Sequence, residues 1–255
     1  MKRMTVAQQK GGVGKTAELI HIAHRGLERG LRVAVIDLDT QRNASTTLKE
    51  YASGVATAAL FRGLGGDEKS SLVLNDREAP RLMLINADED LANLEDMDLE
   101  KVAEHFNASI DWLGEQGYDL CLIDTPPSLG KALTLALYAS EFVISPVQLK
   151  AYSMDGVEKM NLVIGNMREF NPSLKFLGMV PSMFERGKPR QVENMKQLVA
   201  DYPELILPTI GLKDSIEEAI EVGVPVWRIK KTAARAAAKE MRQLADCVFE
   251  KMGIK

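Results

Sequence analysis

One loop near the N-terminus constrains this chain more than any other feature of its sequence. The run Lys10-Gly11-Gly12-Val13-Gly14-Lys15-Thr16 follows a strand-like MTVAQ segment and opens a helical pattern at Ala17. Glycines allow several backbone N–H groups to point inward, and the positive end of the following helix adds to the attraction for phosphate. Lys15 then places a point charge on the β- and γ-phosphate oxygens, and the Thr16 hydroxyl can ligate Mg²⁺. We therefore predict a phosphate-binding loop from Lys10 to Ala17.

The remainder of the chain alternates short apolar runs with helix-length amphipathic segments, which is typical of a parallel sheet with crossover helices. Strands are expected near Met4–Gln8, Arg32–Asp37, Arg81–Asn86, Asp119–Asp124, Glu141–Ser145, Lys175–Pro181 and Leu205–Leu207. Helices are expected at Thr16–Arg29, Leu99–Gln116, Ser153–Phe170, Gln191–Asp201, Ser215–Val222 and Thr232–Met252. With 255 residues, 45% of them hydrophobic, the chain can bury one sizeable core. We predict an α/β fold with a doubly wound, mostly parallel sheet flanked by helices, as one P-loop NTPase domain over residues 1–255.

Three carboxylates stand at the ends of two predicted strands. The run Val33–Ser45 opens with a buried strand that ends in two carboxylates, Asp37 and Asp39. The run Leu120–Ser128 opens with a second buried strand that ends in Asp124. In a doubly wound sheet ligands bind at the carboxyl ends of the strands, so these acids should converge on the phosphate-binding loop. Mg²⁺ resolves the repulsion between carboxylates and phosphates by bridging the oxygens of both. For an isolated aspartate at a strand end a turn cap is the alternative explanation, but the joint occurrence of these acids with the phosphate-binding loop favours the metal site.

The loop departs from the common GxxxxGK[ST] pattern because Gln9 replaces the first glycine and Lys10 precedes the glycine pair. KGGVGKT resembles the deviant Walker A motif of the ParA/MinD superfamily of ATPases. The resemblance is closest to its short, Soj-like ParA members, which have no N-terminal helix-turn-helix; a loop that begins at residue 10 leaves no room for one. In this family the signature lysine, here Lys10, reaches across a face-to-face homodimer to the ATP of the partner.

The segment DLDTQ is similar to the DxDPQ motif of that family, which implies that Asp39 positions water for hydrolysis. The resemblance thus implies an ATPase with ATP and Mg²⁺ as cofactors, Lys10, Lys15 and Asp39 as catalytic residues, and Thr16, Asp39 and the Walker B residue Asp124 as metal ligands. The segment Ser145–Met160 is similar to the PVQxExxAxxGL stretch that follows the next strand in members of that family. Base and ribose contacts are expected from two later loops, Pro181–Phe184 and Pro208–Leu212.

Three residues depart from the family pattern. Thr40 stands where proline is usual, Arg42 where glycine is common, and Ala17 where a second threonine often contacts the α-phosphate. None of these changes removes a group needed for Mg²⁺ or the γ-phosphate. The resemblance therefore implies ATP binding more strongly than fast hydrolysis, which we expect to be weak and stimulated by a partner.

Basic residues gather near the C-terminus of a chain whose formal net charge is −4. From Pro225 to Arg242 there is one acid, Glu240, and six basic residues: Arg228, Lys230, Lys231, Arg235, Lys239 and Arg242. The spacing of the last four puts them on one helix face, and Arg190 lies in a second small cluster with Arg186 and Lys188. A solvated helix face is the commoner reason for such spacing, but the family resemblance favours non-specific DNA binding at these residues.

The resemblance also implies a partner and a location. We expect a ParB-like centromere-binding adaptor protein that stimulates hydrolysis, and a cytoplasmic, nucleoid-associated ATPase that drives plasmid or chromosome segregation. The N-terminus carries no signal-like apolar run and no segment approaches the length of a spanning helix, so we expect the protein to stay in the cytoplasm. We expect no membrane partner, for the reason given next.

Two other functions remain open on the same fold. A MinD-like membrane-associated ATPase would use an apolar stripe at the C-terminus, comprising Met241, Leu244, Val248, Phe249 and Met252. Because Asp246 and Glu250 flank this stripe, packing against the sheet explains it better than lipid contact. A small-molecule ligase such as dethiobiotin synthetase would need a substrate pocket and would not need Lys10.

Overall fold

The computed structural model describes residues 1–74, 76, 78–150 and 154–254. Its centre is a seven-stranded sheet with the strand order β3-β4-β2-β5-β1-β6-β7, and every neighbouring pair is parallel. The strands are β1 (Lys2–Val6), β2 (Arg32–Asp37), β3 (Ala52–Ala56), β4 (Arg81–Asn86), β5 (Leu120–Asp124), β6 (Phe142–Gln148) and β7 (Lys175–Ser182). Parallel neighbours require crossover connections, which helices supply here. The doubly wound α/β architecture predicted from the sequence is confirmed.

Helices connect the strands along the described part of the chain. The α-helices are α1 (Lys15–Glu28), α2 (Asn43–Thr47), α3 (Thr57–Arg62), α4 (Gly66–Leu72), α5 (Leu99–Gln116), α6 (Lys131–Ala139), α7 (Met154–Met167), α8 (Pro189–Asp201), α9 (Asp214–Val222) and α10 (Ala234–Met252). Short 3₁₀ helices are η1 (Lys49–Tyr51), η2 (Glu89–Asp96), η3 (Pro203–Leu205) and η4 (Val226–Arg228).

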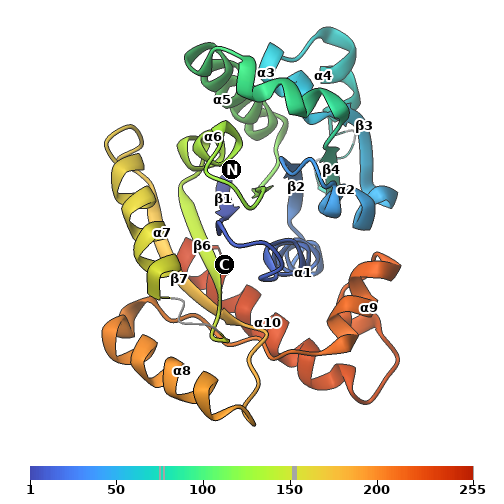
Figure 1. The fold of residues 1–255 in the computed structure, drawn as a ribbon. Helices are drawn as coiled ribbons and strands as arrows, with labels where there is room; N and C mark the ends of the chain where they lie inside the picture. Colours follow the sequence, from blue (N-terminus) through green and yellow to red (C-terminus); the bar gives the residue numbers. More distant parts are fainter. Residues whose placement is uncertain (75, 77, 151–153, 255) are drawn as a thin grey trace.

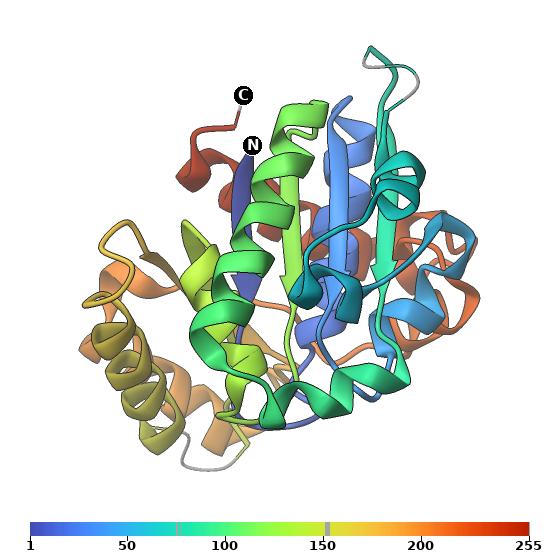
Figure 2. The ribbon, with the colours of Figure 1, turned by 90° about the horizontal axis from the view of Figure 1, so that it is seen from above.

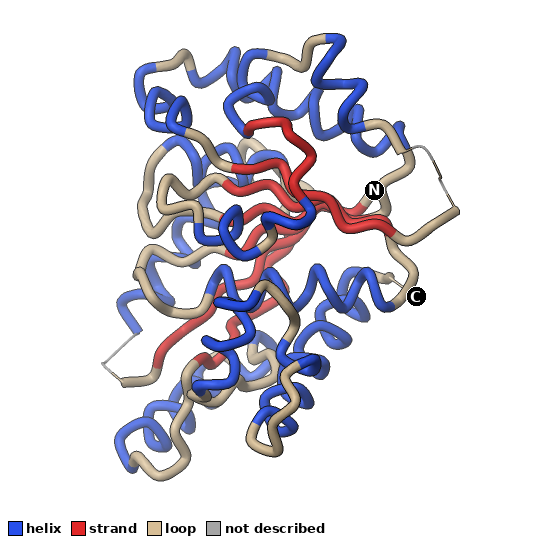
Figure 3. Tube along the Cα trace, turned by 90° about the vertical axis from the view of Figure 1, so that its right-hand side faces the viewer, coloured by secondary structure: helices blue, strands red, loops and turns tan. Residues whose placement is uncertain are grey.

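Each face of the sheet packs against its own layer of helices. In β2, Val33 and Val35 join the core formed with α1 and α10, whereas Ala34 and Ile36 join the core formed with α3, α5 and α6. Successive strand residues point to opposite faces, so both faces of this strand must be apolar. Figure 1 looks nearly along the strands, with α5 and α6 above the sheet and α1 and α10 below it. Figure 2 shows α5 in front of the sheet, and Figure 3 shows the strands running between the two helical layers.

Two strand assignments from the sequence differ from the structure. Leu205–Leu207 was expected as a strand and is not one: the segment begins in η3 and meets the sheet through a single bridge between Met179 and Ile206. Pro203 and Pro208 flank it, and proline cannot donate to a β ladder. The edge strand β3 was not predicted, because the sequence ASGVA is short and has little apolar content.

The last helix also begins later than expected. The predicted helix Thr232–Met252 starts at Ala234, after a turn that follows η4. Lys231 precedes the predicted helix as well as α10, so the predicted four-residue basic face keeps only three members on α10. The predicted helix Ser153–Phe170 corresponds to α7, which ends at Met167. Ser153, the first residue of the predicted helix, lies outside the described residues.

Candidate active site

The phosphate-binding loop lies between β1 and α1, at the carboxyl edge of the sheet. Gly12 has φ 66° and Gly14 has φ 101°, both in the left-handed region that favours glycine. Gly14 is the N-cap of α1, and no side chain accepts a hydrogen bond from the first N–H groups of that helix. These N–H groups are therefore free to bind an anion. Val13, only 1% exposed, fixes the loop to the protein between the two glycines.

The two lysines of the loop lie in different surroundings. Lys15 is 7% exposed, and its burial lowers the pKa of its ammonium group, although Asp124 and Asp39 act in the opposite direction. Phosphate oxygens would supply the charge that a buried ammonium needs. Lys10 is exposed and makes no polar side-chain contact with any described residue. An exposed lysine beside the loop can reach a second molecule, whereas Lys15 can act only within its own site.

Thr16 and Asp124 meet directly behind the loop. The Thr16 hydroxyl donates to Asp124 Oδ2 over 2.7 Å, while the other carboxylate oxygen, Oδ1, is buried and has no hydrogen-bond partner among the described residues. Burial, and then the negative charge of Asp37, raise the pKa of Asp124. An unpartnered buried carboxylate oxygen beside a threonine hydroxyl matches the oxygen donors that Mg²⁺ prefers.

These oxygens do not form a complete metal site. Within the described ranges, no group of three or more His, Cys, Asp or Glu side chains could hold a metal ion. Mg²⁺ commonly uses one or two protein ligands together with substrate phosphates and water. Thr16 and Asp124 therefore fit an ion that arrives with a nucleotide.

The register of the sheet brings the remaining carboxylates to the same edge. Asp37 of β2 pairs with Asp124 of β5, which in turn pairs with Val6 at the end of β1. Asp37 is fully buried, and its two oxygens accept hydrogen bonds from the backbone N–H of Asp39 (3.0 Å) and from the N–H and hydroxyl of Ser45 (2.8 and 2.6 Å). Asp37 thus has no free oxygen for an ion and instead shapes the segment that carries Asp39.

Asp39 lies at the start of a tight turn. It is 5% exposed, and one carboxylate oxygen accepts from the Gln41 N–H over 2.9 Å. Its backbone carbonyl accepts from the Arg42 N–H over 2.8 Å, and Arg42 itself has φ 56°. Glycine adopts this left-handed conformation at a lower free-energy cost than a residue with a Cβ atom, which accounts for the glycine common at this position in the family. The role of Asp39 in hydrolysis stays a prediction.

Two glutamines were missed by the sequence reasoning. Gln8 donates through Nε2 to Ser145 Oγ and to the Pro146 carbonyl, both at 3.2 Å. Gln148, at the end of β6, donates through Nε2 to the Gly12 carbonyl over 2.8 Å. Both side chains tie the phosphate-binding loop to β6. Gln148 belongs to the segment Ser145–Met160 that resembles a family motif, and this was the available signal; residues 151–153 of that segment lie outside the described part.

The two later loops expected to contact base and ribose lie together beside the phosphate-binding loop. Phe184 N–H donates to the Ile210 carbonyl over 3.0 Å, and Ile210 N–H donates to the Pro181 carbonyl over 2.9 Å. Between these loops and the first turn of α1 is a cavity lined by Gly14, Ala17, Glu18, Ser182, Met183 and Gly211, among others. The cavity therefore adjoins the phosphate-binding loop on the side of β7.

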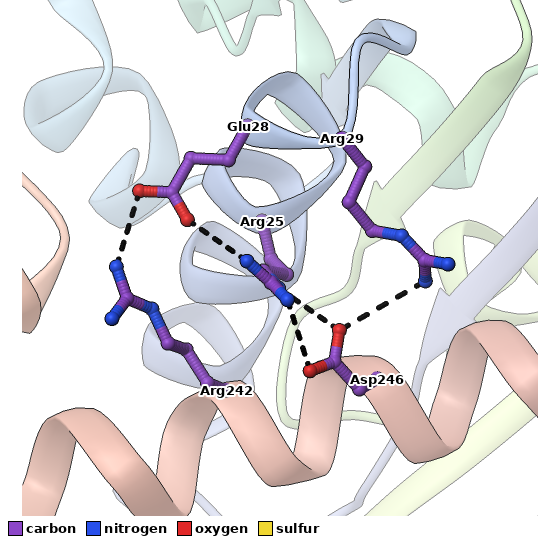
Figure 4. A network of polar contacts seen from close by, with 5 residues as sticks. All are labelled: Arg25, Glu28, Arg29, Arg242 and Asp246. Atoms are coloured by element: carbon purple, nitrogen blue, oxygen red, sulfur yellow. Dashed lines mark hydrogen bonds and ion pairs between the residues drawn. The ribbon is translucent and has the colours of Figure 1, made fainter.

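The predicted DNA-binding residues divide into two groups. Arg190, Arg228, Lys230, Arg235 and Lys239 are exposed and form no ion pair with other described residues. Lys231 pairs with Glu218 over 2.7 Å, and Arg242 pairs with Glu28 over 3.4 Å while its guanidinium lies 4.8 Å from the centre of the Trp227 ring. Figure 4 shows Arg242 in a network that joins α1 to α10. Two of the seven predicted cations are thus partly neutralised.

The C-terminal apolar stripe faces the protein interior. All five of its members are 3% exposed or less and belong to the core shared with α1: Met241, Leu244, Val248, Phe249 and Met252. The prediction that α10 packs against the sheet is confirmed. No helix in the described ranges is long and apolar enough to cross a membrane.

Curated relatives match the chain over its whole length. Protein IncC of Escherichia coli is 50% identical over 257 residues, covering 100% of this chain and 71% of the relative. The chromosome-partitioning ATPase Soj of Thermus thermophilus is 31% identical over 256 residues, covering 99% of this chain and 97% of Soj.

Solved structures share the fold. A putative plasmid partition protein from Borrelia burgdorferi bound to AMPPNP has a TM-score of 0.79 at 22% identity, covering 98% of this chain and 99% of the other. Cobyrinic acid a,c-diamide synthase from Mycobacterium smegmatis, with bound ADP and magnesium, has a TM-score of 0.75 at 27% identity and covers 98% and 94%.

A family model described as an AAA domain matches residues 1–176, which include the phosphate-binding loop, Asp39 and Asp124. The deviant loop with Lys10, the parallel sheet and the relatives agree on one classification. The chain belongs to the ParA/MinD superfamily of partition ATPases.

Proposed function

We propose that this chain is a ParA-type partition ATPase that binds ATP with Mg²⁺, dimerises around the nucleotide and binds DNA without sequence preference. The observation that carries the nucleotide part is the Thr16–Asp124 pair, with its unpartnered Oδ1, directly behind a loop whose helix N-terminus is uncapped. Its whole-length similarity to a chromosome-partitioning ATPase supports the cellular role. The further proposals below concern individual residues.

The residues of the site divide the work of hydrolysis. Thr16 and Asp124 would hold Mg²⁺, and the ion would offset negative charge on the phosphates. Lys15 stabilises the charge that develops on the γ-phosphate, and Asp39 orients the attacking water. Gln8 and Gln148 keep the loop in place against β6. Lys10 makes no polar side-chain contact with the described residues of its own protomer, and it completes the site of a second protomer.

Nucleotide binding and hydrolysis are tested separately. Asp39→Ala should bind ATP with near wild-type affinity, measured by calorimetry, and should release little phosphate. Lys15→Ala should fail at binding. Normal phosphate release by Asp39→Ala would remove Asp39 from the mechanism and leave the binding site intact.

Dimerisation is tested by light scattering with and without ATP and Mg²⁺. The wild type should double its mass with ATP, and Lys10→Ala should stay a monomer while it still binds nucleotide. A wild-type mass that nucleotide does not change would rule out the sandwich dimer.

DNA binding is assigned to the cations without an acidic partner. Arg228 ends η4 and Lys230 follows it, Arg235 and Lys239 lie in the first turns of α10, and Arg190 is the second residue of α8. Contact with phosphates releases counterions, so binding should weaken with salt by a log–log slope of about −0.9 per phosphate contacted. An ATP dimer presents two such surfaces to one duplex, which makes binding depend on nucleotide.

Two matched double variants test this assignment with random-sequence duplex. Arg235→Gln with Lys239→Gln removes two unpaired charges, and Lys231→Gln with Arg242→Gln removes two charges that already have acidic partners. The first pair should lower affinity and salt slope much more than the second, and should abolish nucleoid association in cells. Equal effects of the two double variants would mean that α10 presents only a solvated face. Arg190→Gln tests in the same DNA-binding assay whether the second cluster contributes.

A ParB-like adaptor is the partner that this class of ATPase requires, and adding a candidate adaptor should raise the hydrolysis rate of the wild type.

The likeness to a diamide synthase favours one second candidate, an ATP-dependent ligase. That function predicts ATP binding only when a second small substrate is present, whereas the partition ATPase binds ATP alone.

A further inference from the structure

His21 is a buried histidine of α1 that the proposed mechanism does not use. It is 0% exposed, and its ring joins two segments that lie far apart in the chain. Its Nε2 accepts a hydrogen bond from the Val226 N–H over 3.0 Å, and its Nδ1 lies 2.6 Å from the Ala17 carbonyl oxygen. Ala17 follows Lys15 and Thr16 in the first turn of α1, whereas Val226 begins η4. The ring therefore links the helix of the phosphate-binding loop to η4.

The two hydrogen bonds determine the state of the imidazole. A backbone N–H can only donate, so Nε2 of His21 must be an unprotonated acceptor. A carbonyl oxygen can only accept, so Nδ1 carries the proton and donates it to Ala17. Burial lowers the pKa of the His21 ring from 6.5 to about 4, which agrees with a neutral ring. The acceptor on Nε2 is thus present near neutral pH.

The Val226 N–H depends on this acceptor. The first N–H groups of a helix have no partner within the helix, and Val226 is the first residue of η4. Val226 is 0% exposed, so water cannot take the place of the ring. A buried N–H without an acceptor costs free energy, and loss of Nε2 would therefore favour movement of the start of η4 away from α1. His21 acts as a buried cap for η4.

Two of the cations assigned to DNA binding lie on this capped segment. Arg228 ends η4 and Lys230 follows it, and both are exposed and form no ion pair with other described residues. The Arg228 N–H donates to the Pro225 carbonyl over 2.8 Å, and the Ile229 N–H donates to the Val226 carbonyl over 3.1 Å. The backbone that carries both cations is thus bonded to the residue that His21 holds.

Trp227 adds a second contact between His21 and this surface. The two rings pack edge-on, with centres 5.6 Å apart and planes inclined by 70°. The Arg242 guanidinium lies 4.8 Å from the centre of the Trp227 ring. Trp227 of η4 lines a common groove with Arg235 and Lys239 of α10. A shift of η4 would therefore change the spacing between its own cations and those of α10.

We propose that His21 is a positioning residue for DNA binding: by capping η4 from α1, it holds Arg228 and Lys230 where they reach the phosphates of the same duplex as the cations of α10. His21 is buried and does not contact the DNA itself. The proposal rests on the DNA binding proposed above and names the residue on which the geometry of that surface depends.

The first test compares His21→Phe with His24→Phe, each with ATP and random-sequence duplex. His24 is the matched control, because it lies in the same helix and is 1% exposed, but its Nε2 has no hydrogen-bond partner among the described residues. His21→Phe keeps a ring beside Trp227 and lacks the acceptor, so DNA affinity should fall at least about tenfold. The log–log salt slope should become shallower by about 1 for each cation that no longer reaches a phosphate. His24→Phe should match the wild type in both quantities.

The second test is a double-mutant cycle with Arg228→Gln and Lys230→Gln, made together. This charge pair should lower the affinity of the wild type and of His24→Phe by the same factor, and that of His21→Phe by much less, because its cations are already displaced. His21→Gln should bind DNA more tightly than His21→Phe, since its amide oxygen can accept from the Val226 N–H. If His21→Phe does not fold, His21→Leu takes its place in both tests.

The outcomes separate this proposal from the function on which it rests. A wild type that binds no duplex would refute DNA binding, and the positioning role with it. A wild type that binds duplex, together with a His21→Phe protein that keeps the affinity and salt slope of His24→Phe, would overturn only the role of His21. An undiminished effect of the charge pair in His21→Phe would do the same.

Discussion

His24 makes the stability of this protein depend on pH in a way that one substitution can isolate. The side chain lies in α1, is 1% exposed, and packs edge-on against Tyr51 with ring centres 5.7 Å apart. Burial, together with the positive charges of His21 and Arg228, lowers the pKa of His24 from 6.5 to about 4. Its Nε2 has no hydrogen-bond partner in the described part of the chain, so no acceptor there stabilises the protonated ring.

The sign and size of the effect follow from proton linkage. The unfolded chain takes up a proton as the pH falls through 6.5, while the native state stays neutral down to about 4. Stability from a neutral His24 is therefore complete above pH 6.5 and lost progressively as the pH falls toward 4. The difference between the two pKa values corresponds to about 3 kcal/mol in full, of which about 2 kcal/mol develops between pH 7 and pH 5.

The measurement compares His24→Phe with the wild type by urea denaturation at pH 7 and pH 5. Phenylalanine keeps the ring against Tyr51 and cannot titrate, so the variant should gain about 2 kcal/mol relative to the wild type on going to pH 5. Asp124 and Glu18, whose raised pKa values act with the opposite sign, are present in both proteins and cancel in the difference. His24→Gln should give the same differential. A difference between variant and wild type that does not change with pH would refute the reasoning.

Three further substitutions each test one contact in the fold. Gly223→Ala should cost more than about 1 kcal/mol in urea denaturation, because φ is 75° and the new Cβ would lie 2.7 Å from the Thr47 carbonyl oxygen; a stabilised variant would contradict this. Ser45→Ala should cost about 1–3 kcal/mol by thermal melting, since Asp37 Oδ2 loses a donor and the Ala87 N–H loses its acceptor. Asp246→Asn should cost about 1 kcal/mol or less and lose its effect at high salt, because the pair with Arg25 is partly exposed (Figure 4); a salt-independent loss would argue for packing instead.

Local patterns were enough to predict the loop and most of the sheet. The glycines and Lys15 between a strand and a helix predicted the phosphate-binding loop, since that conformation depends on residues close together in the chain. Apolar runs ending in Asp37 and Asp124 located β2 and β5, because a strand that is buried on both faces consists of consecutive apolar residues. The edge strand β3 carries no such signal, and it was missed.

Tertiary structure decided what each polar group contacts. The sequence placed three acids at strand ends, but only the register of β2, β5 and β1 shows that Asp37 is fully hydrogen-bonded while Asp124 keeps a free oxygen. Likewise, charge spacing grouped Arg235 with Arg242, but the approach of α1 pairs Arg242 with Glu28 and leaves Arg235 unpaired.

The same division holds for the cavity. The sequence by itself determined that Glu18 directly follows the loop, but no local pattern in it indicated that an acid there is buried. Its environment comes from Ser182 and Gly211, which lie far along the chain and meet α1 only when β7 and the loop after η3 pack against it. Short-range patterns specify conformation, whereas burial and hydrogen-bond partners depend on contacts between distant segments, and a single sequence does not encode those in any local pattern.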